Sequence, residues 1–360
     1  MIASLTLTNF RNHKSTRIKT MGAKHIVLFG ANGSGKTNII EAISLLAPGA
    51  GLRRAELSDF QTFESGAGFG VHAELESGDT AATAAAIDAP RRAIKINGQD
   101  SSLAELLKII KPVWITPRED GLFYGGASDR RAFFDHLIAG FSPSHAGRVS
   151  RLAKLTAERA AALRGGAEDG WLSAIEENLM QTASSVAAER VKYCAELNHF
   201  FGAESGFGKN ALAPSGWLED RIAAGEPISK IETDYARYLS ENRILVADRQ
   251  IMDGPHKSDF KVLSVDMNRP AHLCSTGQQK MILLSLALSH ARLIAAIFGA
   301  APVILLDEVA AHLDKDTRAK LLAEFAKIEA QIWMTGTSAS SFGGLPGAAF
   351  IEIGNGRVME

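Results

Sequence analysis

The stretch that decides the fold is Gly30-Ala31-Asn32-Gly33-Ser34-Gly35-Lys36-Thr37. It matches the pattern G-x-x-x-x-G-K-[S/T] at every fixed position. A short β-rich run (24–29) precedes it, and a helical pattern (36–46) follows it. Glycines let successive backbone N–H groups curl around one oxyanion, and the helix adds its positive N-terminal end. The sequence therefore predicts a phosphate-binding loop between a strand and a helix.

Each residue of this loop, together with the adjacent Asn38, is a candidate nucleotide contact. Lys36 would reach the β- and γ-phosphates of ATP, and Thr37 would ligate Mg²⁺ through its hydroxyl group. The alternative is a glycine-rich turn that carries a Lys-Thr pair by chance. The strand before the loop and the helix after it argue against that alternative.

A second signal is the run Pro302-Val303-Ile304-Leu305-Leu306-Asp307-Glu308, four large apolar residues followed by two carboxylates. An apolar run of this kind is typical of a central parallel strand, and ligands bind at the carboxyl ends of such strands. Asp307 would hold Mg²⁺, and Glu308 would act as the general base on the attacking water. Alone the motif is weak, because many buried strands end in an acidic residue.

A third signal is Cys274-Ser275-Thr276-Gly277-Gln278-Gln279-Lys280, which lies before Asp307 and opens a long apolar helix. It resembles the signature of ABC ATPases, usually L-S-G-G-Q, at Ser275, Gly277 and Gln278. In that family the signature faces the γ-phosphate bound by the other subunit, so ATP joins two copies. The stretch 310–314, which comes just after the acidic pair Asp307-Glu308, resembles the D-loop of the family. Without the other motifs, this helix start would be read as an ordinary N-cap.

Bulk composition sets limits on the class of protein. The chain has 360 residues, a net charge of −1 and two cysteines, so neither a strongly basic surface nor a disulfide framework is expected. No apolar signal segment opens the chain. The apolar stretch 281–300 carries His290 and Arg292, which favours a buried helix over a membrane span. We expect a cytoplasmic protein with no membrane partner.

The arrangement of patterns predicts an α/β fold, an ABC-type P-loop ATPase domain with an inserted helical domain. Strand patterns occupy both ends of the chain, whereas helical periodicity dominates from about residue 129 to 201. We place the discontinuous ATPase domain at 1–115 and 240–360, and the helical insert at 116–239. The longest predicted helix, 171–201, suits an antiparallel bundle and is too short for a coiled-coil arm.

Four further stretches resemble the RecF family of DNA replication and repair proteins, and together they span nearly the whole chain. The stretches are Leu5-Thr6-Leu7-Thr8-Asn9-Phe10-Arg11-Asn12-His13, Pro117-Arg118-Glu119-Asp120, Ser128-Asp129-Arg130-Arg131-Ala132-Phe133-Phe134-Asp135 and Asp253-Gly254-Pro255-His256-Lys257-Ser258-Asp259. The last is similar to the G-P-H-R-D-D stretch of the family. Ser258 stands where the family usually has an acidic residue.

The resemblance implies a protein that dimerises with ATP on DNA, either duplex or at junctions between single and double strands. It implies slow hydrolysis that releases the dimer, and a role with RecO and RecR in directing RecA onto single-stranded gaps, in replication restart and the SOS response. In related heads the arginine of the opening motif approaches the nucleotide, which makes Arg11 a candidate; a surface role is the alternative. Candidate DNA contacts are Arg53-Arg54, Arg91-Arg92 and Arg148-Arg151, although a solvated polar face is the more common role of such a cluster.

Three other functions stay open at this point. An ABC transporter subunit usually carries a His after the strand 331–334, where this chain has Thr335-Gly336-Thr337-Ser338. A threonine hydroxyl could contact the γ-phosphate but carries no charge near neutral pH. An SMC/Rad50-like ATPase head would require long coiled-coil arms. An unrelated P-loop kinase would make the signature-like stretch a coincidence.

Overall fold

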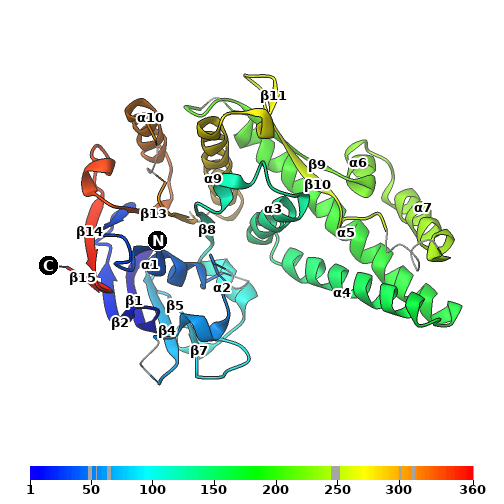
Figure 1. Ribbon diagram of the computed structural model, residues 1–360, viewed down its shortest axis with the longest axis horizontal. Helices are drawn as coiled ribbons and strands as arrows, with labels where there is room; N and C mark the ends of the chain where they lie inside the picture. The colour runs from blue at the N-terminus through cyan, green and yellow to red at the C-terminus, as the bar shows by residue number, and fades with distance from the viewer. Residues whose placement is uncertain are drawn as a thin grey trace. The chain divides into compact units, whose positions relative to one another are not determined.

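The computed structural model describes residues 1–47, 51–53, 55–62, 66–203, 205–244, 252–299, 302–309 and 313–359. The chain divides into two compact units, coloured mostly blue and red for the first and green and yellow for the second (Figure 1). The first unit comprises Met1–Gly121, Glu204–Gly208 and Ser275–Glu360, and the second comprises Leu122–Ala203 and Lys209–Cys274.

The first unit contains two six-stranded sheets. The antiparallel sheet has the order β2-β1-β4-β5-β6-β7, and the other has the order β15-β14-β3-β13-β12-β8. The strands are β1 (Ile2–Phe10), β2 (His13–Lys19), β3 (His25–Phe29), β4 (Phe69–Leu75), β5 (Thr80–Ala85), β6 (Ala93–Ile96), β7 (Gln99–Asp100), β8 (Pro112–Ile115), β12 (Val303–Leu306), β13 (Gln331–Gly336), β14 (Ala349–Gly354) and β15 (Arg357–Val358). The helices are α1 (Lys36–Ser44), α2 (Leu103–Ile109), α9 (Thr276–Phe298) and α10 (Lys315–Phe325), with 3-10 turns η1 (Leu57–Phe60), η2 (Glu119–Gly121) and η4 (Ala339–Phe342).

The second sheet positions the predicted site. Strands β14, β3, β13, β12 and β8 run parallel to their neighbours, and only the short β15 is antiparallel. β12 is buried on both faces, as its uninterrupted apolar sequence predicts. Because β3, β13 and β12 are adjacent and parallel, the residues that follow them emerge at one edge of the sheet. The phosphate loop follows β3, and the acidic pair follows β12.

Helix α1 joins the phosphate loop to the core of the first unit. Seven of its nine residues are buried, and its apolar side chains, including Ile39 and Ile43, belong to one cluster with residues of both sheets. Leu7 of β1, Leu28 of β3 and Leu305 of β12 belong to the same cluster. The phosphate loop therefore continues into a helix whose position is fixed by close packing in the core.

The second unit combines long helices with a small sheet. Its helices are α3 (Ala127–Phe141), α4 (His145–Arg164), α5 (Asp169–Phe201), α6 (Trp217–Ala223) and α7 (Ile228–Glu241), and its strands are β9 (Asn210–Ser215), β10 (Asp259–Ser264) and β11 (Arg269–Pro270), followed by the turn η3 (Ala271–Leu273). The sheet is antiparallel in the order β11-β10-β9. Helix α5, the longest, packs against α4, α6, α7 and β9.

The domain boundaries differ from the predicted ones. The sequence predicts that the insert ends at 239 and that the ATPase domain resumes at 240, whereas the second unit continues to Cys274. The reason is the pairing of β10 with β9, which lies inside the predicted insert. The alternating pattern of β10 identifies a strand, but it contains no information about the partner of that strand.

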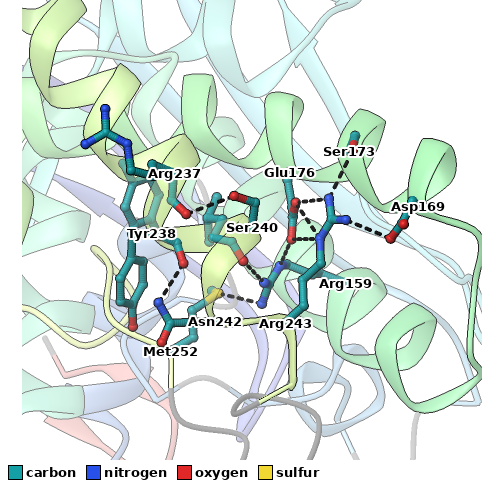
Figure 2. A network of polar contacts seen from close by, with 12 residues as sticks. Arg159, Asp169, Ser173, Glu176, Arg237, Tyr238, Ser240, Asn242, Arg243 and Met252 are labelled. Atoms are coloured by element: carbon teal, nitrogen blue, oxygen red, sulfur yellow. Dashed lines mark hydrogen bonds and ion pairs between the residues drawn. The ribbon is translucent and has the colours of Figure 1, made fainter.

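A buried arginine ties three helices of the second unit together (Figure 2). Arg159 of α4 is 1% exposed, and its Nε donates to Oε1 of Glu176 on α5 at 2.8 Å. Its Nη2 donates to the carbonyl oxygen of Leu239 on α7 at 2.7 Å. Arg243, two residues beyond the end of α7, donates to the same Glu176 carboxylate. The buried Glu176 carboxylate thus bonds two guanidinium groups, and Asp169 provides a second carboxylate for Arg243 at 2.9 Å.

A second buried network explains how the chain accommodates Ser258. Arg190 of α5 forms ion pairs with Asp135 of α3 and Glu219 of α6 at 2.8 and 3.0 Å, and it donates to the carbonyl oxygen of Pro255. The hydroxyl of Ser258 donates to the Glu219 carboxylate at 2.6 Å. Ser258 is therefore a hydrogen-bond donor to a buried carboxylate that also pairs with Arg190.

Helix α9 is the one helix among the described residues with the length and apolar composition of a membrane span. Two thirds of its most apolar window (67%) is buried inside the folded chain. The core helix of a soluble protein has the same properties, as the sequence predicts for 281–300.

Candidate functional site

The phosphate loop has the backbone geometry of an anion cradle. Gly30, Gly33 and Gly35 have φ of 143°, 78° and 110°, which an L side chain rarely adopts. A Cβ on Gly30 would lie 2.3 Å from the carbonyl oxygen of Ile353, and a Cβ on Gly35 would lie 2.6 Å from Nε2 of His13. Helix α1 begins directly after Gly35 with no side-chain cap and no acidic residue in its first turn. Its positive end is therefore available to an anion.

The loop lines a pocket of about 150 Å³ with polar walls, together with Glu308 from the acidic pair and Arg53. Lys36 is 7% exposed and donates to the carbonyl oxygens of Gly30 and Ala31 at 2.9 and 2.7 Å. Burial lowers the pKa of Lys36, while the charges of Glu308 and Asp307 oppose that shift. The hydroxyl of Ser34 is buried and has no hydrogen-bond partner among the described residues. A loop with a cation, an unpaired hydroxyl and a helix N-terminus fits a phosphate group.

The acidic pair meets the loop as the sequence predicts. The hydroxyl of Thr37 donates to Oδ1 of Asp307 at 2.9 Å, although the two residues are 270 positions apart. A hydroxyl and a carboxylate converging in this way suit a hard divalent cation such as Mg²⁺. Glu308 is exposed and has a φ of 49°, an uncommon left-handed backbone conformation that aims its side chain into the pocket.

Thr335 links the two acidic residues, a role that the sequence did not reveal. It is fully buried at the end of β13, and its hydroxyl donates to Oδ1 of Asp307 at 2.7 Å. The hydroxyl oxygen of Thr335 in turn accepts from the backbone N–H of Glu308 at 2.9 Å. Thr335 is thus engaged beneath the acidic pair rather than presented to a phosphate. Thr337, two residues later, is exposed.

Replacing Thr335 by valine should destabilise the first unit. Valine keeps the shape of threonine but leaves the Glu308 N–H without its acceptor and removes one of the two hydrogen bonds to Oδ1 of Asp307, which costs about 1–3 kcal/mol of unfolding free energy. Denaturant unfolding of Thr335→Val measures this loss. The matched control is Thr337→Val, which should leave stability unchanged. Equal stability of the two variants would show that Thr335 does not support the acidic pair.

Two arginines converge on one buried carboxylate beside the loop. Glu41 of α1 is fully buried and accepts two hydrogen bonds from Arg11, from Nε and Nη2, each at 2.9 Å. Arg53 donates to the same carboxylate at 3.1 Å and to Oδ1 of Asn38 at 2.9 Å. Of the two arginines, Arg53 lines the pocket and Arg11 does not, and the Arg11 guanidinium also lies over the ring of Phe60. Arg53, which the sequence suggested as a DNA contact, is therefore the better candidate for a bound anion.

Residues at the turn between β1 and β2 form hydrogen bonds with the phosphate loop. Asn12 donates to the carbonyl oxygen of Ser34 at 3.2 Å and accepts from Asn38 at 2.8 Å. Nε2 of the buried His13 lies 3.0 Å from the carbonyl oxygen of Gly35, and burial lowers the pKa of this histidine. The opening motif of the chain thus supports the loop structurally. The resemblance to a known family singled out this motif in the sequence, but nothing in the sequence showed its contact with the loop.

The signature stretch starts α9 and faces solvent. Ser275 is the N-cap: its hydroxyl accepts from the N–H of Gln278, and the Gln278 side chain accepts from the N–H of Ser275. Ser275, Gly277 and Gln278 are exposed, and none of them lines the pocket of the phosphate loop. A helix N-terminus that is capped but uncovered is free to meet a group from another molecule.

The remaining predicted residues are those of the D-loop and the other candidate DNA contacts. Most of the D-loop, residues 310–312, and Arg54 lie outside the described residues. Arg92 donates to the carbonyl oxygens of Leu45 and Ala47 at the end of α1, so it has a structural role. Arg148 pairs with Glu189 at 2.5 Å, and Arg151 donates to Asn178 at 2.7 Å. Arg91 is exposed.

Comparison with known families gives a full-length match. The family model described as RecF/RecN/SMC N terminal domain matches residues 1–342. A DNA replication and repair protein RecF of Brucella suis biovar 1 (strain 1330) is 40% identical over 371 residues, covering 99% of this chain and 95% of the relative. A RecF of Rhizobium rhizogenes (strain K84) is 37% identical, covering 100% of this chain and 98% of the relative.

Solved structures share the fold. The structure of the recombination mediator protein RecF with ATPrS, in the RecFOR pathway, superposes with a TM-score of 0.86 at 23% identity and covers 99% of this chain and 97% of that chain. An SMC head bound to the C-winged helix domain of ScpA has a TM-score of 0.55 at 16% identity and covers 99% of this chain and 95% of that chain. The fold is thus that of RecF and of SMC heads. With relatives at 37–40% identity along its whole length, the chain belongs to the RecF family.

Proposed function

We propose that this protein is an ATP-binding ATPase whose nucleotide lies in the loop pocket. Residues 30–38 would surround the phosphates, with Lys36 on the β- and γ-phosphates and Arg53 at the mouth of the pocket. Thr37 and Asp307 would hold Mg²⁺, which neutralises phosphate charge when bound. The observation that carries the proposal is the convergence of loop, acidic pair and Thr335 at the ends of three adjacent parallel strands.

Hydrolysis would use Glu308 as the general base. The water oxygen attacks the γ-phosphorus, the bond from that phosphorus to the β–γ bridging oxygen breaks, and the water proton passes to the Glu308 carboxylate. Glu308 is exposed in the single chain, which leaves water free to exchange around it. Slow hydrolysis would follow from an incomplete site that closes only when a second molecule covers it.

The second molecule would be another copy of this chain. Ser275, Gly277 and Gln278 are exposed at the positive end of a 23-residue helix and contribute nothing to the pocket of their own chain. They would contact the γ-phosphate held by the partner, giving two shared sites in a two-fold symmetric dimer. Bound ATP would thus be the link between subunits, and hydrolysis would separate them.

The cellular role would be DNA repair in the cytoplasm. Relatives at 37–40% identity are DNA replication and repair proteins named RecF, and a structure of the same fold belongs to the RecFOR pathway. The ATP-bound dimer would bind duplex DNA or junctions and act with RecR and RecO to direct RecA onto single-stranded gaps. Replication restart and the SOS response would depend on this step. Phosphate contacts by arginines and lysines would make DNA binding fall with salt.

The decisive experiment follows molar mass and DNA binding together. Light scattering should show a monomer without nucleotide and a dimer with ATP and Mg²⁺. Gapped DNA should be bound, and its mobility in a gel should shift, only in the presence of ATP and Mg²⁺. Lys36→Ala should abolish both effects, because the loop loses the charge that offsets the phosphates. The control is Lys154→Ala, an exposed lysine of α4 outside the site. A constant mass and no DNA shift in the wild type would refute the proposed function.

A further inference from the structure

A groove of about 620 Å³ runs along strand β10 within the second unit, and the proposed function does not use it. One wall is the loop 123–125, and the other is 270–272, from the end of β11 into the turn η3. Arg130 fixes the first wall, because it donates to the carbonyl oxygen of Gly125 at 2.5 Å and forms two hydrogen bonds with Asp259 of β10. The lining is mainly apolar.

The floor of this groove is a partly open strand edge. β9 pairs with β10 from Asp259 to Ser264, whereas β11 covers only Leu263 and Ser264 on the other side. Val262 stands opposite Leu212, whose N–H and C=O are both bonded to the side chain of Asn198. Val262 and Leu212 are therefore a non-hydrogen-bonded pair, so the N–H and C=O of Val262 point away from β9. The pairing of Leu263 with Pro270, which has no N–H, requires the C=O of Val262 to accept from the N–H of Ala271. The N–H of Val262 is the group that has no partner among the described residues.

The open edge is positively charged. Lys261 and His272 line the groove and Arg269 lies on β11 beside it, all three exposed and without an ion pair in the described part of the chain. The carboxylate that lines the groove, Asp259, is already neutralised by Arg130 at 2.7 Å. A ligand with carboxylate groups is thus favoured over a basic one.

We propose that this groove binds an extended, acidic and apolar segment of a partner protein, which adds a strand to the free edge of β10. The segment would hydrogen-bond to Val262 through its main chain, which provides affinity without sequence preference. Alternate side chains would enter the apolar groove, and an acidic side chain would lie near Lys261. Specificity would come from these two features.

The residues at the open edge of β10 favour pairing with a selected partner strand over aggregation. Unprotected strand edges invite uncontrolled pairing, and natural sheets limit it with lysines, prolines and short edge strands. Here Lys261 and Pro270 flank the open position, and β11 is only two residues long. A basic or uncharged strand would leave the charge of Lys261 without a partner, whereas an acidic strand would neutralise that charge.

The test selects peptides on the full-length protein from a random twelve-residue display library and measures the binding of selected peptides by fluorescence polarisation. Selected peptides should alternate apolar and acidic residues and should bind the wild type. Val262→Pro removes the free N–H without removing a bond to β9, and Lys261→Glu reverses the charge; each should weaken binding about tenfold or more. Lys154→Glu, the control on α4, should bind as the wild type does.

Three results would overturn the proposal. Selection could yield no peptide, or peptides that bind both groove variants as tightly as the wild type. Alternatively, the groove variants could change the molar mass in light scattering, which would make the groove a contact between copies of this chain. Lys261→Glu changes only an exposed side chain, so it keeps the test valid even where Val262→Pro fails to fold. Hydrogen exchange should show the Val262 amide slowed by bound peptide and fast without it.

Discussion

Replacing Glu308 by glutamine should slow ATP hydrolysis by about two to four orders of magnitude while nucleotide binding persists. Glutamine has nearly the same shape and fills the same space in the pocket, but its amide cannot accept the proton of the attacking water. Lys36, Thr37 and Asp307 keep their contacts with one another and with the loop. The triphosphate therefore stays intact, and the ATP-linked dimer should accumulate.

Phosphate release and molar mass should be measured on the same samples. Wild type with ATP should dimerise transiently and return to monomer as ATP is consumed, whereas Glu308→Gln should remain dimeric. Glu177→Gln, an exposed carboxylate of α5, is the matched control and should behave as the wild type does. Normal hydrolysis by Glu308→Gln would remove Glu308 from the role of base. Loss of nucleotide binding would instead show that Glu308 is needed for binding.

The sequence predicted the parts of the site that depend on neighbours in the chain. The order strand, glycine loop, helix is local, and it places the loop at the end of β3 and the start of α1. The apolar run before Asp307 predicts a buried parallel strand, and the contact of Thr37 with Asp307 follows because parallel strands end at one edge. Ser275 as a helix start also follows from local pattern.

Parts that depend on tertiary contact were not predictable. Glu41 lies in the middle of the α1 pattern, where nothing local shows that it holds both Arg11 and Arg53. Arg53 looked like a member of a basic cluster because its neighbour is also arginine. The pairing of β9 with β10 joins residues about 50 positions apart, and this pairing moved the domain boundary. Single-sequence periodicity reports which face of an element is buried but not against which partner.

Replacing Ser275 by arginine should abolish ATP-dependent dimerisation while each chain still binds nucleotide. The arginine side chain would project from the N-cap of α9 into the space that the partner's γ-phosphate is proposed to occupy, and steric overlap would prevent closure. The pocket of the same chain contains none of the signature residues, so its affinity for ATP should stay within about twofold of the wild type. Losing the N-cap costs about 1 kcal/mol of stability, which Ser275→Ala controls for.

Mixing two inactive variants separates a shared site from a site built within one chain. Lys36→Ala breaks the loop, and Ser275→Arg breaks the signature. In a mixed dimer, one site combines the intact loop of the Ser275→Arg subunit with the intact signature of the Lys36→Ala subunit, and the other site carries both defects. Because neither variant pairs with itself, each dimer in an equal mixture is a mixed one with one good site of two, and hydrolysis should recover to at most about half of the wild-type rate. If both defects acted within one chain, no mixture could recover activity, so a mixture that stays inactive would favour that model over the shared site.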